Sequence, residues 1–306
     1  MFGGSRAGAK GFVKRLRFAL LMVTLAPVLL IGAGLRWLAR RTNWRCDASV
    51  TVVFHKILCA ALGVRVAVHG RLAGSATLIA ANHVSWLDIP VLGSQLPLAF
   101  LAKSEVGRAS LARGIAELQG VVFVDRRRSR RIPEVNRQIA RTLRGGVSLV
   151  LFAEATTGDG NRMLRFRSSH FEGLRETLSS GTSRALVQPV HIAYRRRAGV
   201  PLGRVGQPLV AWYGDMTFAD HLWRLLRDGP FDCEITFGEP IAFFRTSQRK
   251  EIALQAYASV RQLAADRRSA KLPGESGPVP AVAGQTRHSP GENCLIDCKS
   301  QRKSAQ

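Results

Sequence analysis

The feature that most limits the fold of this chain is the alternation of short apolar runs with helical patterns from residue 64 onward. The run at 147–153 has the length and character of a strand that is buried on both faces. Strands that alternate with helices are typical of a parallel sheet covered by helices. The sequence therefore predicts an α/β domain with a mostly parallel sheet flanked by helices.

Periodicity and chain-breaking residues locate the elements of this domain. A helix is expected at 133–144, which begins with proline, carries an apolar stripe and stops at a Gly-Gly pair. A second helix is expected at 250–267, again from apolar residues on one side. The predicted strands are 64–69, 77–81, 98–102, 121–124, 147–153, 186–194 and 234–237.

Ahead of this domain, residues 18–35 contain no charge and are flanked by basic residues on both sides. As a helix, this stretch would be about 27 Å long, near the lower limit for crossing a bilayer. Basic residues follow it where a signal peptide would have a cleavage site of small residues. We expect an N-terminal hydrophobic membrane-anchor helix. A spanning helix, a shallow re-entrant anchor and a buried helix of a soluble protein remain open.

These features divide the chain into three parts. Residues 1–63 hold the expected anchor and an amphipathic helix at 50–63, which His55 and Lys56 make too polar to span a membrane. Residues 64–268 form the α/β domain. Residues 269–306 are rich in Gly, Pro, Ser and charge without apolar periodicity, which predicts a disordered basic tail.

The chain is strongly basic, with 45 Lys and Arg against 21 Asp and Glu and a net charge of +24. Such a charge attracts nucleic acid or the anionic face of a bilayer. No aromatic stacking run, recognition-helix pattern or zinc spacing supports a nucleic-acid partner, and the uncharged segment favours a membrane. The five cysteines are irregularly spaced, so we expect no disulfide framework, no metal site and a reducing cytoplasm.

The segment Asn82-His83-Val84-Ser85-Trp86-Leu87-Asp88 directly follows the predicted strand 77–81. Open α/β sheets place their chemistry in loops at the carboxyl ends of strands. A neutral imidazole can accept a proton from an alcohol, and a carboxylate can orient the imidazole and stabilise its charged form. On a straight helix His83 and Asp88 would lie about 140° apart, so a tight turn must bring them together. A histidine that caps a turn, before an aspartate that starts a helix, is the structural alternative.

Three further blocks follow this segment. They are Gly120-x-x-Phe123-x-x-Arg126, Phe152-Ala153-Glu154-Ala155-Thr156 and Val187-x-Pro189-Val190. Each block is short, but the four in this order resemble the motifs of the glycerolipid acyltransferases, the 1-acylglycerol-3-phosphate acyltransferase family. The resemblance covers roughly residues 64 to 240.

The resemblance implies an O-acyltransferase that moves a fatty acyl chain from acyl carrier protein or acyl-CoA to the free hydroxyl of a lysolipid. It implies no metal or organic cofactor, and it assigns His83 as the general base and Asp88 as the group that orients it. Arg126 would bind the anionic head group, because a guanidinium matches phosphate or carboxylate. The implied substrate-binding residues are Asn82, Ser85, Gly120, Phe123, Arg126, Glu154 and Thr156. The expected location is the inner membrane, with the catalytic domain facing the cytoplasm.

The third block departs from the family pattern Phe-Pro-Glu-Gly-Thr, because Ala153 replaces proline and Ala155 replaces glycine. If that glycine supplies a positive φ, Ala155 adopts the same conformation at a cost in free energy. A catalytically impaired lipid-binding paralogue is therefore the alternative function. A hydrolase is disfavoured, because the chain has no Gly-x-Ser-x-Gly.

The residues that follow, Thr156-Thr157-Gly158-Asp159-Gly160-Asn161, look more like bacterial lyso-ornithine lipid acyltransferases than like common lysophosphatidate enzymes. The same residues also make a good turn without any role in acceptor choice. The acceptor thus stays open between lyso-ornithine lipid and 1-acyl-glycerol-3-phosphate.

Overall fold

The computed structural model describes residues 47–74, 76–103, 121–124, 132–178 and 183–269, together with single helical positions between 16 and 34. Apart from those positions, the predicted anchor at 18–35 lies outside the described residues, as does the tail beyond 269. In the described part of the chain, no helix is both long and apolar enough to cross a membrane. The anchor helix therefore remains a prediction.

Nine strands of the described chain join in one sheet, in the order β1-β8-β6-β2-β5-β3-β4, with β7 and β9 also paired to β6. The strands are β1 (Val64–His69), β2 (Thr77–Ala81), β3 (Ala99–Lys103), β4 (Val121–Val124), β5 (Leu149–Phe152), β6 (Ala185–Arg197), β7 (Val200–Pro201), β8 (Phe231–Phe237) and β9 (Ile241–Phe243). All seven predicted strands are present, with shifted ends in four of them, and β7 and β9 are additional.

The mostly parallel sheet is confirmed. Strands β2 to β6 pair in parallel, and so do β1 and β8. Strand β6 pairs antiparallel with β7, β8 and β9, so the direction of the sheet reverses between β6 and β8. The positions of apolar runs do not predict this reversal, because strand direction depends on how the connections between strands run.

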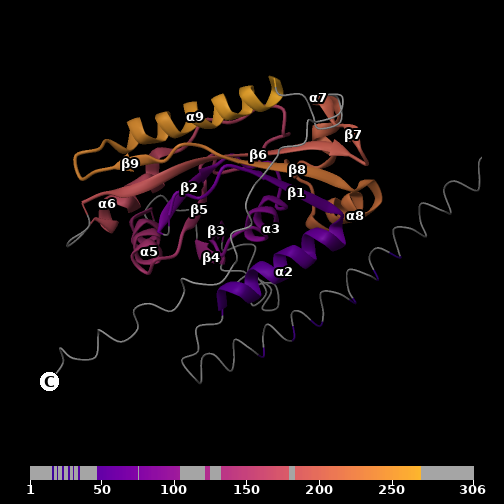
Figure 1. The fold of residues 1–306 in the computed structure, drawn as a ribbon, viewed down its shortest axis with the longest axis horizontal. Helices are drawn as coiled ribbons and strands as arrows, with labels where there is room; N and C mark the ends of the chain where they lie inside the picture. The colour runs from indigo at the N-terminus through magenta and orange to yellow at the C-terminus, as the bar shows by residue number, and fades with distance from the viewer. Residues whose placement is uncertain are drawn as a thin grey trace, which may run out of the picture. The chain divides into compact units, whose positions relative to one another are not determined.

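Helices cover both faces of the sheet (Figure 1). The cores show α2 (Asp47–Leu62), α3 (Asp88–Gly93) and α8 (Phe218–Asp228) on one face. On the other face lie α5 (Ile132–Arg144), α6 (Gly173–Thr177) and α9 (Arg249–Ser269). The short helices η3 (Ser168–Glu172), α7 (Gly203–Gly206) and η4 (Gln207–Leu209) lie in the connections.

The central strand β2 divides its side chains between these two faces, as the two-residue period of a strand requires. Ile79 and Ala81 join the core beneath α2, α3 and α8, whereas Leu78 and Ala80 join the core beneath α5, α6 and α9. All five residues of β2 are buried. The end of β2 is therefore fixed from both sides, and the segment that follows it begins at a well-defined point.

The predicted helices at 133–144 and 250–267 are α5 and α9, and the one at 50–63 is most of α2. Helix α8 was not predicted, although the Thr217 side chain caps it by accepting from the Asp220 N–H, which is a recognisable start signal. Helix α3 begins at Asp88, as the structural alternative for this residue proposed, but its extent was not predicted because its six residues are too few to show a helical period.

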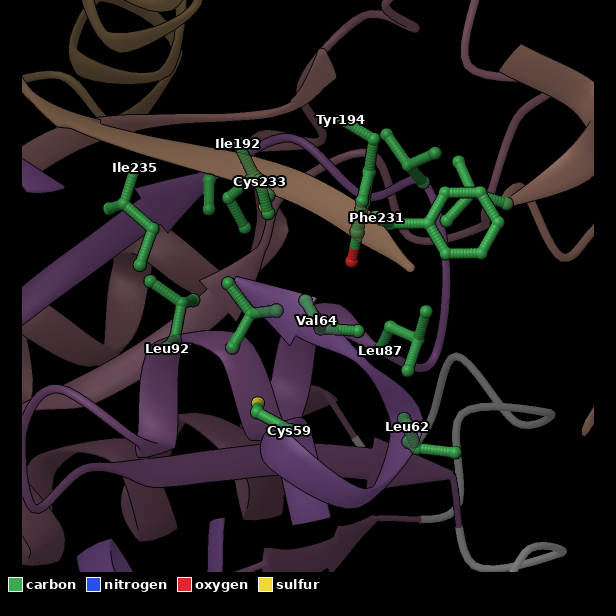
Figure 2. Close-up of a cluster of buried hydrophobic side chains, with 14 of the residues drawn as sticks. Cys59, Leu62, Val64, Leu87, Leu92, Ile192, Tyr194, Phe231, Cys233 and Ile235 are labelled. Atoms are coloured by element: carbon green, nitrogen blue, oxygen red, sulfur yellow. The ribbon is translucent and has the colours of Figure 1, made fainter. Parts of the chain in front are cut away.

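Figure 2 shows the core on the α2 and α3 side of the sheet. Helix α2 contributes Cys59 and Leu62, while Leu87 and Leu92 come from α3 and the residue before it. Strands β6 and β8 supply the opposite wall, including Tyr194 and Phe231. This core holds α3 against the sheet at the point where the His83–Asp88 segment ends.

Helix α2 approaches α3 closely at Gly93. The buried His55 ring fills the space where a Cβ of residue 93 would lie. His55 also lies edge-on to the Phe100 ring, at 6.2 Å between ring centroids. Glycine is therefore required at position 93 by the close contact of two helices rather than by backbone conformation.

We predict that Gly93→Ala destabilises the fold. Alanine improves helix propensity by about 1 kcal/mol, but an added methyl in a packed core costs about 1–3 kcal/mol, so the clash with His55 dominates. The free energy of unfolding measured in urea should fall. In a His55→Ala background the same substitution should lose much less stability, and an equal loss in both backgrounds would contradict the packing explanation.

Candidate active site

The segment after β2 folds into a tight turn that brings His83 and Asp88 together. The Asp88 N–H donates to the Ser85 carbonyl at 3.0 Å, and α3 begins at Asp88 itself. The His83 Nδ1 lies 2.8 Å from the Asp88 Oδ2. The tight turn expected from the five-residue spacing is thus present, and the contact is direct.

The Asp88 carboxylate is fully buried, at 0% exposure, and each of its oxygens accepts hydrogen bonds. Oδ2 accepts from the Val84 N–H at 2.7 Å and the Ser85 N–H at 3.0 Å, in addition to His83. Oδ1 accepts from the Tyr194 hydroxyl at 2.8 Å. A buried carboxylate is tolerated only when it is paired and hydrogen-bonded, so these donors allow a charged group to sit in an apolar core.

The His83 ring is fixed on its face as well as at its edge. It stacks on the Phe152 ring, with 3.9 Å between centroids and 12° between planes. Since a carboxylate only accepts hydrogen bonds, Nδ1 must carry the proton that bonds Asp88, and the neutral ring then has its lone pair on Nε2. The His83 side chain is 17% exposed, so Nε2 of a partly accessible ring can act as a general base.

Glu154, just beyond the end of β5, holds the backbone on either side of the site. Its Oε1 accepts from the His83 N–H at 3.0 Å, and its Oε2 accepts from the Leu164 N–H at 3.0 Å. Burial raises the pKa of Glu154 from 4.5 to about 7, because the charged form loses its hydration. The carboxyl group therefore connects the His83 turn to the loop that follows β5.

The chain is similar in sequence to a family of known proteins. The family model described as Acyltransferase matches residues 65–193, which include the whole His83–Asp88 turn and Glu154. A lyso-ornithine lipid O-acyltransferase of Rhizobium meliloti (strain 1021) is 38% identical over 76% of this chain and 76% of that protein. One from Brucella abortus (strain 2308) is 40% identical over 69% of this chain and 79% of that protein. The chain belongs to this acyltransferase family.

A solved structure of the family shares the fold. The 1-acyl-sn-glycerophosphate acyltransferase PlsC from Thermotoga maritima aligns with a TM-score of 0.54 at 20% identity. The alignment covers 85% of this acyltransferase and 99% of PlsC. The chain therefore shares the α/β fold of PlsC.

The altered third block of this acyltransferase has a visible consequence for the backbone. Ala155, where the family pattern has glycine, adopts a φ of 63°. An L-residue in this left-handed region is strained by about 1–2 kcal/mol. The expectation that the glycine position needs a positive φ is confirmed, and the acyltransferase keeps the conformation without the glycine.

The remaining residues predicted to bind substrate have different positions. The Asn82 amide bonds the backbone of Ile192 on β6 in both directions, at 3.0 and 2.8 Å. Ser85 is fully buried within the turn, whereas Thr156 is exposed in the loop after β5. Gly120 and Arg126 lie outside the described residues, and Phe123 is described only as a backbone position of β4.

Tyr194, which bonds Asp88 from β6, was not among the predicted site residues. A tyrosine inside a predicted buried strand was a usable signal, because a buried phenol needs a hydrogen-bond partner. Trp86, in contrast, turns away from Asp88: its Nε1 donates to the His221 Nδ1 of α8 at 2.9 Å, and its ring contacts Phe218. Trp86 therefore packs the turn against α8.

We predict a pH-dependent loss of stability that is traceable to Glu154. Because its pKa is raised in the folded state, the folded chain keeps a proton that the unfolded chain has lost between pH 4.5 and about 7. The free energy of unfolding should therefore fall by about 3 kcal/mol as the pH rises through this window. The difference between wild type and Glu154→Gln, measured in urea at several pH values, isolates this contribution. A difference that is independent of pH would contradict it.

We also predict that Ala155→Gly stabilises the acyltransferase. Relief of the left-handed strain outweighs the entropy that glycine adds to the unfolded chain. The free energy of unfolding should therefore rise by about 0.5 kcal/mol. Ala265→Gly, at an exposed position of α9, is the matched control and should lose about 1 kcal/mol. Urea unfolding of both variants tests the prediction, and losses of equal size would argue against strain at Ala155.

Proposed function

We propose that this acyltransferase transfers a fatty acyl chain from a thioester, carried by acyl carrier protein or coenzyme A, to the free hydroxyl of lyso-ornithine lipid. The observation that carries the proposal is the His83–Asp88 pair: Nδ1 is held 2.8 Å from a fully buried carboxylate. This contact leaves Nε2 of the partly exposed side chain to take the hydroxyl proton.

The transfer then proceeds without an enzyme-bound acyl group. His83 removes the proton as the acceptor oxygen attacks the thioester carbonyl, and a tetrahedral intermediate forms. The intermediate collapses by breaking the carbon–sulfur bond, and the thiolate that leaves takes the proton from the His83 imidazolium. Asp88 stabilises the imidazolium while it exists and keeps the ring in one tautomer.

Backbone positioning supports this assignment. Glu154 holds the His83 N–H, and the Gly158 N–H lies 3.4 Å from the His83 carbonyl. Gly160 of the same loop lies against Val84 and Gln207, where a Cβ would come within 3.3 Å of both side chains. The loop of the third block therefore packs directly on the catalytic turn. This position suits a loop that contacts the acceptor.

Lyso-ornithine lipid is proposed as the acceptor for two reasons. The loop just described carries the Thr156 to Asn161 pattern that resembles lyso-ornithine lipid enzymes, and two relatives at 38% and 40% identity bear that name. Arg126 of the second block is the proposed contact for the anionic group of the lipid. The phosphate of 1-acyl-glycerol-3-phosphate offers the same Arg126 a similar charge, which makes it the competing acceptor.

The charge of the chain suits both the lipid and the donor. A net charge of +24 favours an anionic bilayer and an acidic carrier protein, and such long-range attraction weakens with salt. We propose that the enzyme works at the inner membrane with its catalytic domain facing the cytoplasm, anchored by residues 18–35.

An acceptor panel tests the proposal. Membranes containing the full chain are given a labelled acyl carrier protein thioester with lyso-ornithine lipid, 1-acyl-glycerol-3-phosphate or no acceptor. We predict transfer mainly to lyso-ornithine lipid, abolition by His83→Ala and a loss on the order of 10³-fold in Asp88→Asn, because an amide cannot stabilise the imidazolium. His69→Ala, on β1 and outside the catalytic turn, should retain activity.

Each outcome has a definite meaning. Full transfer by His83→Ala would remove the assignment of the base. Transfer to 1-acyl-glycerol-3-phosphate alone would overturn the acceptor, and no transfer by a folded wild-type chain to any acceptor would favour the impaired lipid-binding paralogue.

A further inference from the structure

We propose that Tyr194 is a positioning residue that sets the proton affinity of the His83–Asp88 pair by donating a hydrogen bond to the far oxygen of Asp88. The proposal rests on the proposed role of His83 as the base. It adds a third side chain to the pair, from β6, at a position four residues beyond the fourth sequence block.

The two oxygens of Asp88 have different hydrogen-bond partners. Oδ2 faces the turn and accepts from His83, Val84 and Ser85. Oδ1 faces β6 and accepts from the Tyr194 hydroxyl at 2.8 Å. Tyr194 and His83 therefore contact one carboxylate from opposite sides. Because they share its charge, a change in one hydrogen bond alters the strength of the other.

The surroundings of Tyr194 indicate that its hydroxyl, and not only its ring, matters. Tyr194 is 1% exposed and belongs to an apolar cluster with Val64, Leu87 and Phe231. Figure 2 shows its hydroxyl pointing into this cluster rather than toward solvent. A phenylalanine would supply the same apolar contacts without burying a polar atom that needs a partner.

The hydroxyl is held in its donor form. Burial, followed by the nearby charge of Asp88, keeps the pKa of Tyr194 well above its usual value. The phenol therefore stays protonated at every pH at which a histidine can titrate, and its bond to Oδ1 is constant while His83 gains and loses its proton.

The backbone of β6 fixes the position of this hydroxyl. Asn82, the residue before His83, bonds both backbone groups of Ile192, and the Gln207 Nε2 donates to the Tyr194 carbonyl at 3.0 Å. The pairing of β6 with β8 shifts register between Tyr194 and Arg196. Irregularities of this kind re-aim side chains next to active sites, and here Asn82 ties the strand to the catalytic turn just before that point.

The sign of the effect follows from electrostatics. A hydrogen bond to Oδ1 stabilises the carboxylate charge and so weakens the pull of Asp88 on the proton of His83. When the bond is removed, the carboxylate charge is less stabilised and attracts the proton of the imidazole more strongly. The limb of the pH–rate profile that reports protonation of the base should therefore move to higher pH.

The test uses Tyr194→Phe in the full chain, assayed in membranes with the acyl thioester and the acceptor that wild type uses. We expect kcat to fall about ten-fold, the acid limb of kcat/KM to move up by about one pH unit, and the KM for the thioester to stay within about two-fold. Tyr257→Phe, which removes a phenol from α9, is the matched control and should leave the profile unchanged.

Two further measurements separate positioning from packing. If Tyr194 acts through Asp88, Tyr194→Phe should have little further effect in an Asp88→Asn background, whereas a packing role would give the same loss in both. Replacing tyrosine with 3-fluorotyrosine in a Tyr213→Phe/Tyr257→Phe chain strengthens the donor without changing the fold, and should move the acid limb to lower pH. This second measurement stands even if Tyr194→Phe fails to fold.

The outcomes distinguish the two proposals. An active wild type whose acid limb stays fixed in Tyr194→Phe or in the fluorinated chain overturns the role of Tyr194 and leaves the proposed function intact. A folded wild type that transfers no acyl group overturns the proposed function itself.

Discussion

A carboxylate with no exposure to water is stable only where donors replace its hydration, and at Asp88 those donors come from His83, Val84, Ser85 and Tyr194. Two of the four are backbone groups of the turn itself, so the turn and the buried charge stabilise one another. The remaining two reach the carboxylate from the solvent side and from β6. The tautomer of the His83 ring follows from this one buried group, and its position follows from that group together with the stacked Phe152 ring.

The rest of the domain can be understood as support for that arrangement. Strand β2 is buried on both faces and delivers the turn from the middle of the sheet, between β5 and β6. Strand β5 supplies Phe152 under the imidazole, followed by Glu154, and β6 supplies Tyr194 and the backbone that Asn82 holds. Because the carboxyl ends of these three parallel strands lie side by side, residues far apart in sequence meet at one edge of the sheet.

The sequence predicted His83, Asp88 and Glu154 through their resemblance to the acyltransferase motifs, and it placed His83 and Asp88 in a segment after a predicted strand. It could not place Tyr194, because nothing local states that β6 lies beside β2 or that its register points residue 194 at residue 88. A helix start at Asp88 was considered, but the extent of α3 could not be predicted because the helix is too short to show a period. The reversal of direction at β8 depends on the path of the connections, which an apolar run does not encode. The positive φ at Ala155, in contrast, could be inferred because the family pattern has glycine at this position.

The packing of α2 also supports the position of Asp88. His55 on α2 occupies the notch left by Gly93 at the end of α3, and Cys59 and Leu62 enter the same core as Leu87 and Tyr194. Asp88 opens α3, so the helix that carries the buried charge is held at one end by the hydrogen-bonded turn and at the other by α2. A displacement of α2 must therefore either open the core around Tyr194 or move α3. Asp88 lies on α3 and its donor Tyr194 lies in that core, so the packing of α2 is linked to the contacts that orient His83.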